Sequence, residues 1–178
     1  MIKIEREKRE LAYQGTILTI YRDTVRLPNG ETEDWDTVHH NGAAAVIPVL
    51  SDGRILMVRQ YRNALNRFML ELPAGALDSP DEPDEVCAAR ELEEETGYRS
   101  ENLERLICVN TTVAFCDERI GVFVARDLIP SRQKLDAGES LDVLAYTMEE
   151  LEGKIFSGEI TDGKTIAGLM AYKVRYCS

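Results

Sequence analysis

The stretch from Glu82 to Tyr98, EPDEVCAARELEEETGY, is the part of the sequence that decides the fold. It predicts a helix, because Pro83 suits the first turn, acidic residues crowd the start, where the helix dipole favours them, and Gly97 suits the position after the end. Residues 78–97 hold nine acidic side chains and one basic one, a net charge of −8. Such crowding has two explanations, a solvated helix face or a site for divalent metal ions.

Three glutamates of this helix share one face. Glu91, Glu94 and Glu95 are spaced i, i+3 and i+4, and therefore lie within an arc of about 100°. Like charges at these spacings destabilise an isolated helix by roughly 0.2–0.5 kcal/mol per pair. Hard oxygen ligands in such an arc are, however, what Mg²⁺ or Mn²⁺ prefers. Arg90 can pair with Glu94 one turn later, and Glu93 points away. The spacing alone leaves a solvated surface as the alternative.

Composition and charge exclude several classes of protein. The chain has 178 residues and a formal net charge of −11, which argues against a nucleic-acid backbone as main partner, because phosphate backbones need a basic surface. Without an apolar run of about 18 residues or an apolar segment behind the charged N-terminus, we expect neither a membrane span nor a signal peptide. The cysteines lack metal-site spacing and indicate reduced thiols in a cytoplasmic protein. They are Cys87, Cys108, Cys116 and Cys177.

The rest of the chain predicts strands on both sides of this helix. Asn29-Gly30 predicts a hairpin, and SDG at 51–53 predicts a second one, because such turns need residues that tolerate φ > 0. A capping box at Thr147 opens a helix to about residue 156, and a last helix covers about 162–176. The predicted strands are 15–27, 31–40, 43–50, 54–62, a short one within 68–75, 103–113, 118–128 and 141–147. Together they predict an α/β (α+β) fold with a mixed sheet, in one domain.

The spacing around the acidic helix resembles a known signature. From Glu82 to Gly97 the chain matches EX7REUXEEXG, the second half of the Nudix hydrolase signature GX5EX7REUXEEXGU, at every specified position. Six residues rather than five separate Gly75 from Glu82, and Tyr98 takes the last bulky position, which is more often aliphatic. The extra residue falls in a loop, where an insertion costs little. The resemblance implies a Nudix fold, an α/β/α sandwich with a central mixed sheet plus an N-terminal antiparallel hairpin segment.

The resemblance also implies an activity. Nudix enzymes hydrolyse a nucleoside diphosphate linked to another group with the help of several divalent cations. By this resemblance Glu91, Glu94 and Glu95 bind two or more Mg²⁺ (or Mn²⁺) ions, and Arg90 orients a glutamate. A cluster is needed because cations must neutralise the diphosphate and lower the pKa of the attacking water.

Sequence outside the signature is similar to the ADP-ribose and nucleotide-sugar pyrophosphatase branch. ELPAG at 71–75 implies that the carbonyl of Ala74 is a metal ligand and that Glu71 contributes to substrate binding. VRQYR at 58–62 implies that Arg62 contacts a substrate phosphate. GESLDV at 138–143 resembles a mobile acidic loop in which Glu139 binds metal or acts as the general base. DGKT at 162–165 also recurs in that branch.

The N-terminal segment carries the only tryptophan. In relatives acting on ADP-ribose, an aromatic residue near this place stacks on the base and the next acid hydrogen-bonds it, which makes Trp35 and Asp36 candidates; a half-buried strand tryptophan is the alternative. The N-terminal segment of this branch also builds a homodimer. We therefore expect one domain over 1–178, with a dimer-forming strand segment at 1–42 and a catalytic core at 43–178.

One departure bears on the substrate. Enzymes of this branch that act on ADP-ribose usually carry SPG followed by an F-x-D-E-like stretch beyond the signature. Here Val113 and Ala114 replace the proline and glycine, with Phe115, Asp117 and Glu118 retained, which weakens ADP-ribose as the preferred substrate. Hydrolysis of ADP-ribose to AMP and ribose 5-phosphate, or of a related nucleotide sugar, is the expected reaction. A pyrophosphatase for GDP-mannose, another sugar nucleotide or a dinucleotide is the alternative, and a non-catalytic nucleotide-sugar-binding module is the alternative of another class.

Overall fold

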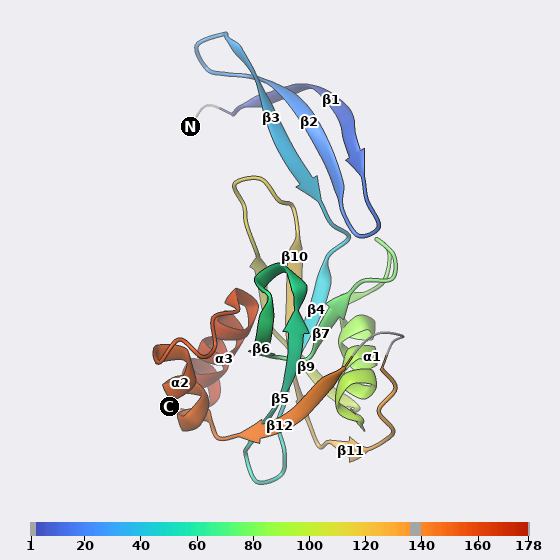
Figure 1. Cartoon of the computed structure of the whole chain (residues 1–178), viewed down its shortest axis with the longest axis vertical. Coiled ribbons are helices and arrows are strands. Elements are labelled where there is room, and N and C mark those ends of the chain that lie inside the picture. The colour runs from blue at the N-terminus through green and yellow to red at the C-terminus, as the bar shows by residue number, and fades with distance from the viewer. Residues whose placement is uncertain (1–2, 136–139, 178) are drawn as a thin grey trace. The chain divides into compact units, whose positions relative to one another are not determined.

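The structure, a computed structural model, describes residues 3–135 and 140–177 (Figure 1). It contains two units, which we describe separately. One unit joins the N-terminal residues up to Asn41 to the segment Asn110–Arg119. The other contains Gly42–Val109 and the chain from Ile120 onward. No helix among the described residues is long and apolar enough to cross a membrane.

The first unit is built on a three-stranded antiparallel sheet. Its strands β1 (Glu5–Gln14), β2 (Thr19–Arg26) and β3 (Thr32–His39) lie in chain order. The β2–β3 hairpin was predicted, and Gly30 in its turn has a φ of 89°. Strand β1 was not predicted, because all ten of its residues are exposed and the first six, Glu5 to Glu10, are charged, so that no apolar alternation marks it.

The segment Asn110–Arg119 joins this unit through the end of β3. The amide of Val38 donates to the carbonyl of Phe115 at 2.7 Å, and the amide of Asp117 donates to the carbonyl of Val38 at 3.1 Å. The side chains of His39 and Asp117 also pair, at 2.8 Å. The first unit thus contains both the N-terminal candidates and the stretch in which the sequence departs from the SPG pattern.

The second unit is organised around a central mixed sheet. Its strand order is β7 (Ala74–Ala76), β4 (Ala43–Pro48), β10 (Arg119–Arg126) and β9 (Asn102–Asn110). Strand β4 runs parallel to β10 and antiparallel to β7, so the sheet is mixed, as predicted.

Alternate residues of β4 face different helices. Ala44 and Val46 lie in buried clusters with residues of α1 (Asp84–Thr96), whereas Ala45 and Ile47 lie in a cluster with residues of α2 (Met148–Phe156) and α3 (Gly163–Tyr176). Because successive side chains of a strand point to opposite faces, helices cover both faces of this sheet (Figure 1). The predicted α/β/α sandwich is confirmed, and the nearly continuous apolar sequence of β4 follows from burial on both faces.

The hairpin predicted at 43–62 is wrong in part. Strand β5 (Ile55–Arg62) belongs to a separate antiparallel sheet, between β12 (Leu141–Tyr146) and β6 (Arg67–Glu71). Only a bridge between Val49 and Ile55 continues from the turn, after which β4 and β5 separate. The turn signal was correct, but the partners of the two strands are distant in sequence, and a turn does not specify them. The 3₁₀ turn η1 (Asn63–Leu65) and the short pair β8 (Tyr98–Arg99) and β11 (Ile129–Pro130) complete the elements.

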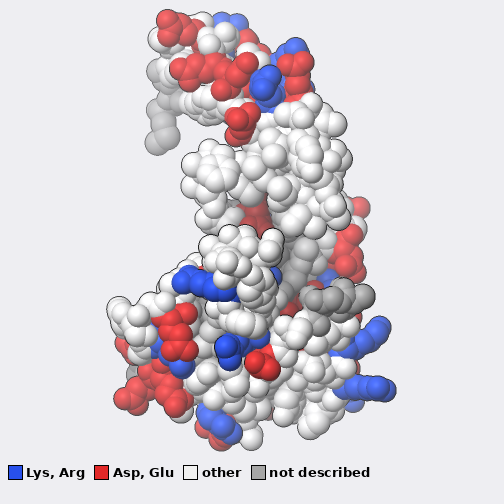
Figure 2. All heavy atoms as spheres, viewed as in Figure 1, with Lys and Arg blue, Asp and Glu red and all other residues white. Residues whose placement is uncertain are grey.

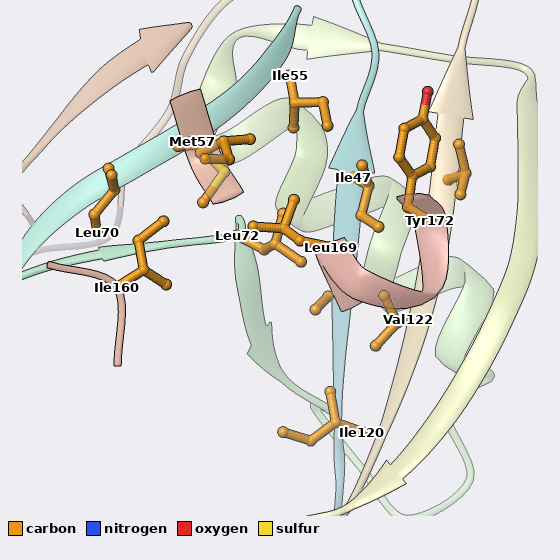
Figure 3. Close-up of a cluster of buried hydrophobic side chains, with 13 residues drawn as sticks. Ile47, Ile55, Met57, Leu70, Leu72, Ile120, Val122, Ile160, Leu169 and Tyr172 are labelled. Atoms are coloured by element: carbon orange, nitrogen blue, oxygen red, sulfur yellow. The ribbon is translucent and has the colours of Figure 1, made fainter. Parts of the chain in front are cut away.

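The main core lies between the sheets and the helices α2 and α3. Figure 3 shows Ile47, Val122, Leu169 and Tyr172, which come from β4, β10 and α3 and belong to one buried cluster. Gly168 of α3 lets that helix pack closely, since a Cβ there would lie 3.0 Å from Leu72. On the face shown in Figure 2, acidic and basic side chains are interspersed.

Candidate functional site

Helix α1 begins and ends as its sequence predicts. Pro83 is the residue before its first turn, and Gly97 ends it in the left-handed conformation with a φ of 73°, its amide donating to the carbonyl of Glu93 at 2.9 Å. Asp84 in the first turn is buried and pairs with Arg105 of β9. One acid of the crowded stretch therefore anchors the helix rather than binding a ligand.

Glu91 lies directly against Gly75. A Cβ atom built on Gly75 would lie 1.9 Å from Oε1 of Glu91, well inside contact distance. Only glycine leaves room for the carboxylate at this place. Glu91 is 9% exposed, so its charge is held at the edge of the protein interior next to β7. This contact gives a physical reason for the glycine that begins the signature.

Arg90 binds two glutamates that follow it on the helix. Its Nη1 donates to Glu91 at 2.5 Å and to Glu94 at 3.3 Å, and its Nη2 donates to the carbonyl of Ala76 at 3.0 Å. Burial opposes the charge of Arg90, but the carboxylate of Glu91 and other nearby anions outweigh that effect and raise the arginine's pKa. The sequence led us to expect the pair with Glu94; the shorter contact is with Glu91.

Glu95 connects the helix to β7. It is 2% exposed, and its Oε2 accepts a hydrogen bond from the amide of Ala74 at 2.9 Å. Glu94 is half-buried, and Glu93 points elsewhere and accepts a bond from the hydroxyl of Ser131. The helix face that holds Glu91 and Glu95 thus lies against the strand that supplies Ala74.

The segment 131–134 is bonded to the C-terminal end of α1. The amide of Lys134 donates to the carbonyl of Glu94 at 3.0 Å, and the side chain of Gln133 donates to the carbonyl of Glu95 at 2.6 Å. These bonds satisfy carbonyls that a helix end leaves without partners. Sequence reasoning missed Gln133, because nothing in a polar loop marks which helix end it covers. Glu139 lies outside the described residues.

Arg62 and Glu71 form a second cluster in the same unit. Nε and Nη2 of Arg62 donate to the two carboxylate oxygens of Glu71, each at 2.8 Å, and Nζ of Lys164 donates to Glu71 at 2.6 Å. The negative charge of Glu95 also helps to raise the pKa of Arg62, after the larger effect of Glu71. Sequence reasoning missed Lys164, although it lies in the DGKT motif. A cavity of about 400 Å³ is lined by Arg62, Ala64, Leu65, Met69, Glu71, Thr161, Asp162, Gly163 and Lys164.

Trp35 and Asp36 belong to the other unit. Both lie on β3; Trp35 is 42% exposed, and its ring nitrogen donates to Glu33 at 3.1 Å. Asp36 is exposed. Trp35 is therefore partly accessible to solvent.

The side chains beside Gly75 fit a divalent cation by their donor chemistry. Glu91, Glu94, Glu95 and the carbonyl of Ala74 supply hard oxygen atoms, which Mg²⁺ and Mn²⁺ prefer. Within residues 3–135 and 140–177, no three His, Cys, Asp or Glu side chains converge tightly enough to hold a metal ion. In this structure Glu91 is turned toward Arg90 and Glu95 toward Ala74.

Comparison with known proteins gives a family and several relatives. The NUDIX domain model matches residues 39–168. The chain is 38% identical over 170 residues to the ADP-ribose pyrophosphatase of Bacillus subtilis (strain 168), covering 94% of this chain and 89% of that protein. It is 40% identical over 161 residues to the methanol dehydrogenase activator of Bacillus methanolicus, covering 89% and 86%. It is 33% identical over 144 residues to the GDP-mannose pyrophosphatase of Cronobacter sakazakii, covering 76% and 74%.

A solved structure has the same fold. The crystal structure of an ADP compounds hydrolase superposes with a TM-score of 0.86 over 98% of this chain and 94% of that one. The two sequences are 18% identical, so the likeness concerns the fold.

Proposed function

The chain belongs to the Nudix hydrolase family, and from this premise we propose that it hydrolyses the diphosphate bond of ADP-ribose or a related nucleotide sugar. For ADP-ribose the products are AMP and ribose 5-phosphate. The observation that carries the proposal is the position of the Glu91 carboxylate, which lies against Gly75 and is bonded to Arg90. A buried acid held in this way beside two further glutamates is unfavourable for stability alone, and a cationic ligand compensates for it.

We assign the metal ligands to α1 and β7. Glu91, Glu94, Glu95 and the carbonyl of Ala74 hold two or more Mg²⁺ (or Mn²⁺) ions, and Arg90 positions Glu91 and Glu94. Once bound, the ions supply charge neutralisation of the diphosphate and activation of the attacking water. We also propose that Glu139 is a metal ligand or the general base.

We assign substrate recognition to Arg62, Trp35 and Asp36. Arg62 binds a phosphate oxygen, for which a guanidinium is well suited. Trp35 stacks on the base and Asp36 accepts a hydrogen bond from it. The exposure of Trp35 supports the first of these roles.

A panel of substrates tests the proposal. The protein is incubated with Mg²⁺ and ADP-ribose, GDP-mannose, UDP-glucose or NADH, and the products are separated by chromatography. We expect AMP and ribose 5-phosphate from ADP-ribose, and no product when EDTA removes the metal. Cleavage of GDP-mannose far faster than ADP-ribose would contradict the first choice of substrate.

Two observations favour other functions and define further outcomes of the panel. Val113 and Ala114 in place of the SPG pattern, together with the Cronobacter relative, favour GDP-mannose or another sugar nucleotide. The relative named as a methanol dehydrogenase activator favours a regulatory or binding module. Binding of nucleotide sugars without cleavage would support that class and overturn the enzymatic proposal.

Replacing Glu95 tests the assignment of the acidic face. Glu95→Gln keeps the size of the side chain and an acceptor for the amide of Ala74, but removes the charge. We expect normal folding by circular dichroism and turnover reduced at least about a hundredfold, as loss of a metal ligand or its support can cause. Glu93→Gln, on the other side of the helix, is the matched control and retains activity. Near-normal turnover of Glu95→Gln removes Glu95 from the mechanism.

We further propose that the protein is a cytoplasmic homodimer assembled through residues 1–42. Exposed apolar side chains on the N-terminal unit, including Leu11 and Tyr13, support an interface there. Sedimentation equilibrium should give twice the mass of 20.1 kDa, and a monomer would contradict the proposal. Cell fractionation tests the location.

A further inference from the structure

Glu71 is a buried carboxylate whose two oxygens are both bound to cations. It is 3% exposed at the end of β6, where Arg62 grips it through two parallel hydrogen bonds and Lys164 adds a third. Paired guanidinium–carboxylate bonds of this kind fix the plane of both groups. Burial alone would raise the pKa of Glu71, but Arg62 and Lys164 lower it to about 2, so the carboxylate is charged at neutral pH.

Lys164 is itself fixed by the start of α3. Its Nζ donates to Asp162 at 3.0 Å, and the same carboxylate caps the helix by accepting from the amide of Thr165 at 3.0 Å. The hydroxyl of Thr165, in turn, accepts from the amide of Leu72 at 2.9 Å. The end of β6 and the start of α3 are thereby joined around Glu71.

The two hydrogen bonds to Glu71 use one edge of the Arg62 guanidinium and leave the other edge exposed. Nε and Nη2 point to Glu71, whereas Nη1 makes no hydrogen bond with any of the described residues. The side chain of Arg62 is 40% exposed and borders the cavity of about 400 Å³. A guanidinium held by one edge presents its remaining donors in a fixed direction, which reduces the entropy lost when it binds an oxyanion.

We propose that Glu71, braced by Lys164, is a positioning residue that aims the free edge of Arg62 into this cavity to bind a phosphate oxygen of the diphosphate substrate. The inference rests on the proposed function for the chemistry of the ligand. It assigns Glu71 a role through Arg62 rather than direct contact with the substrate, because both of its oxygens are already bound.

The decisive measurement is binding of the non-hydrolysable analogue α,β-methylene ADP-ribose, by calorimetry, to the full chain and its variants in Mg²⁺. Glu71→Gln keeps the shape of the side chain and removes its charge, and we expect the Kd to rise at least about tenfold. With a cleaved substrate, KM rises by a similar factor while kcat changes by less than about threefold, because uniform binding is lost. Lys164→Met weakens binding less, and Lys164→Arg restores it.

Asp84→Asn is the matched control. It breaks another ion pair of a largely buried aspartate, with Arg105, on the same unit. We expect this variant to lower the melting temperature without weakening the binding of the analogue. Equal weakening by Asp84→Asn and Glu71→Gln would mean general destabilisation and would overturn the inference. If Glu71→Gln does not fold, the comparison of Lys164→Met with Lys164→Arg tests the inference instead. Equal affinity of these two variants for the analogue would overturn the proposed role of Lys164 in holding Glu71.

These outcomes separate the inference from the proposed function. Suppose that the wild-type protein binds the analogue but cleaves no nucleotide sugar, and that Glu71→Gln binds the analogue more weakly. This result supports the role of Glu71 and contradicts the enzymatic function. If the wild-type protein cleaves a nucleotide sugar and Glu71→Gln binds the analogue normally, the enzymatic function is supported and the role of Glu71 is contradicted. Absence of analogue binding by the wild-type protein overturns the inference.

Discussion

At the scale of single residues, the acids of α1 differ by what they touch. Asp84 pairs with Arg105 and anchors the helix, whereas Glu93 bonds a serine of the following segment. Glu91 and Glu95 are buried against β7. Burial of two carboxylates on one face distinguishes this helix from a solvated acidic one, in which such side chains stay in water.

Gly75→Ala tests the contact that seats Glu91. The new methyl group would lie 1.9 Å from Oε1 of Glu91, so the carboxylate must move and the contact with Arg90 must change. We expect turnover reduced at least about a hundredfold with the fold retained by circular dichroism. The control is Gly153→Ala in α2, where nothing lies within 4 Å of an added Cβ. It should keep full activity and stabilise the helix by about 0.5–1 kcal/mol. Full activity of Gly75→Ala would show that the contact between Gly75 and Glu91 is not needed for turnover.

At the scale of elements, the helix ends determine how the site is held. Helix α1 ends at Gly97 and is covered by segment 131–134, while α3 begins at Asp162, which also holds Lys164. Helix α2, by contrast, has a capping box on the exposed surface, in which the hydrogen bonds join Thr147 and Glu150 to each other. Its cap therefore affects stability alone.

Thr147→Ala tests that separation. The variant loses the hydroxyl that accepts from the amide of Glu150 at 3.2 Å, so the free energy of unfolding should fall by about 1 kcal/mol. Urea denaturation measures this change, and kcat/KM at a temperature well below unfolding should stay within about twofold of wild type. A large loss of kcat/KM would show that α2 is coupled to the site. Thr147→Ser, which keeps the hydroxyl, is the control.

At the scale of the whole molecule, each unit contains a buried carboxylate held by arginine. The pKa of Asp23 in the N-terminal unit is lowered from 3.8 to about 2, chiefly by hydrogen bonds from Arg9, and that of Glu71 in the other unit is lowered from 4.5 to about 2. Both groups bind protons more weakly in the folded than in the unfolded state. Their contribution to stability is therefore complete above about pH 4.5 and is lost as the pH falls toward 2.

Urea denaturation as a function of pH tests this linkage. We expect the unfolding free energy of the wild-type protein to decrease between about pH 4.5 and about pH 2, and the gap between wild type and Glu71→Gln to shrink over the same range. The gap should be constant between about pH 6 and about pH 8, where Glu71 is ionised in both states. A gap that persists unchanged at about pH 2 would contradict the assignment of the shift to Glu71.

The sequence by itself determined the elements whose signals are local. The span of α1, its termination at Gly97, the β2–β3 hairpin and the capping box of α2 all follow from caps, turn residues and periodicity within a few neighbouring residues. The spacing of Glu91, Glu94 and Glu95 likewise fixes them on one helix face. These features depend on the backbone and on side chains a few residues apart, so they could be predicted before any packing was known.

Tertiary structure alone decided which elements meet. The separation of β4 from β5, the pairing of the fully exposed β1, the contact of Glu91 with Gly75 and the bond from Lys164 to Glu71, 93 residues earlier, have no local signal. All of these contacts except the pairing of β1, which β2 follows directly in the chain, require segments apart in the sequence to be brought together by burial of a shared apolar core. Burial depends on apolar area and is not directional, so the sequence encodes these contacts only through the fold as a whole.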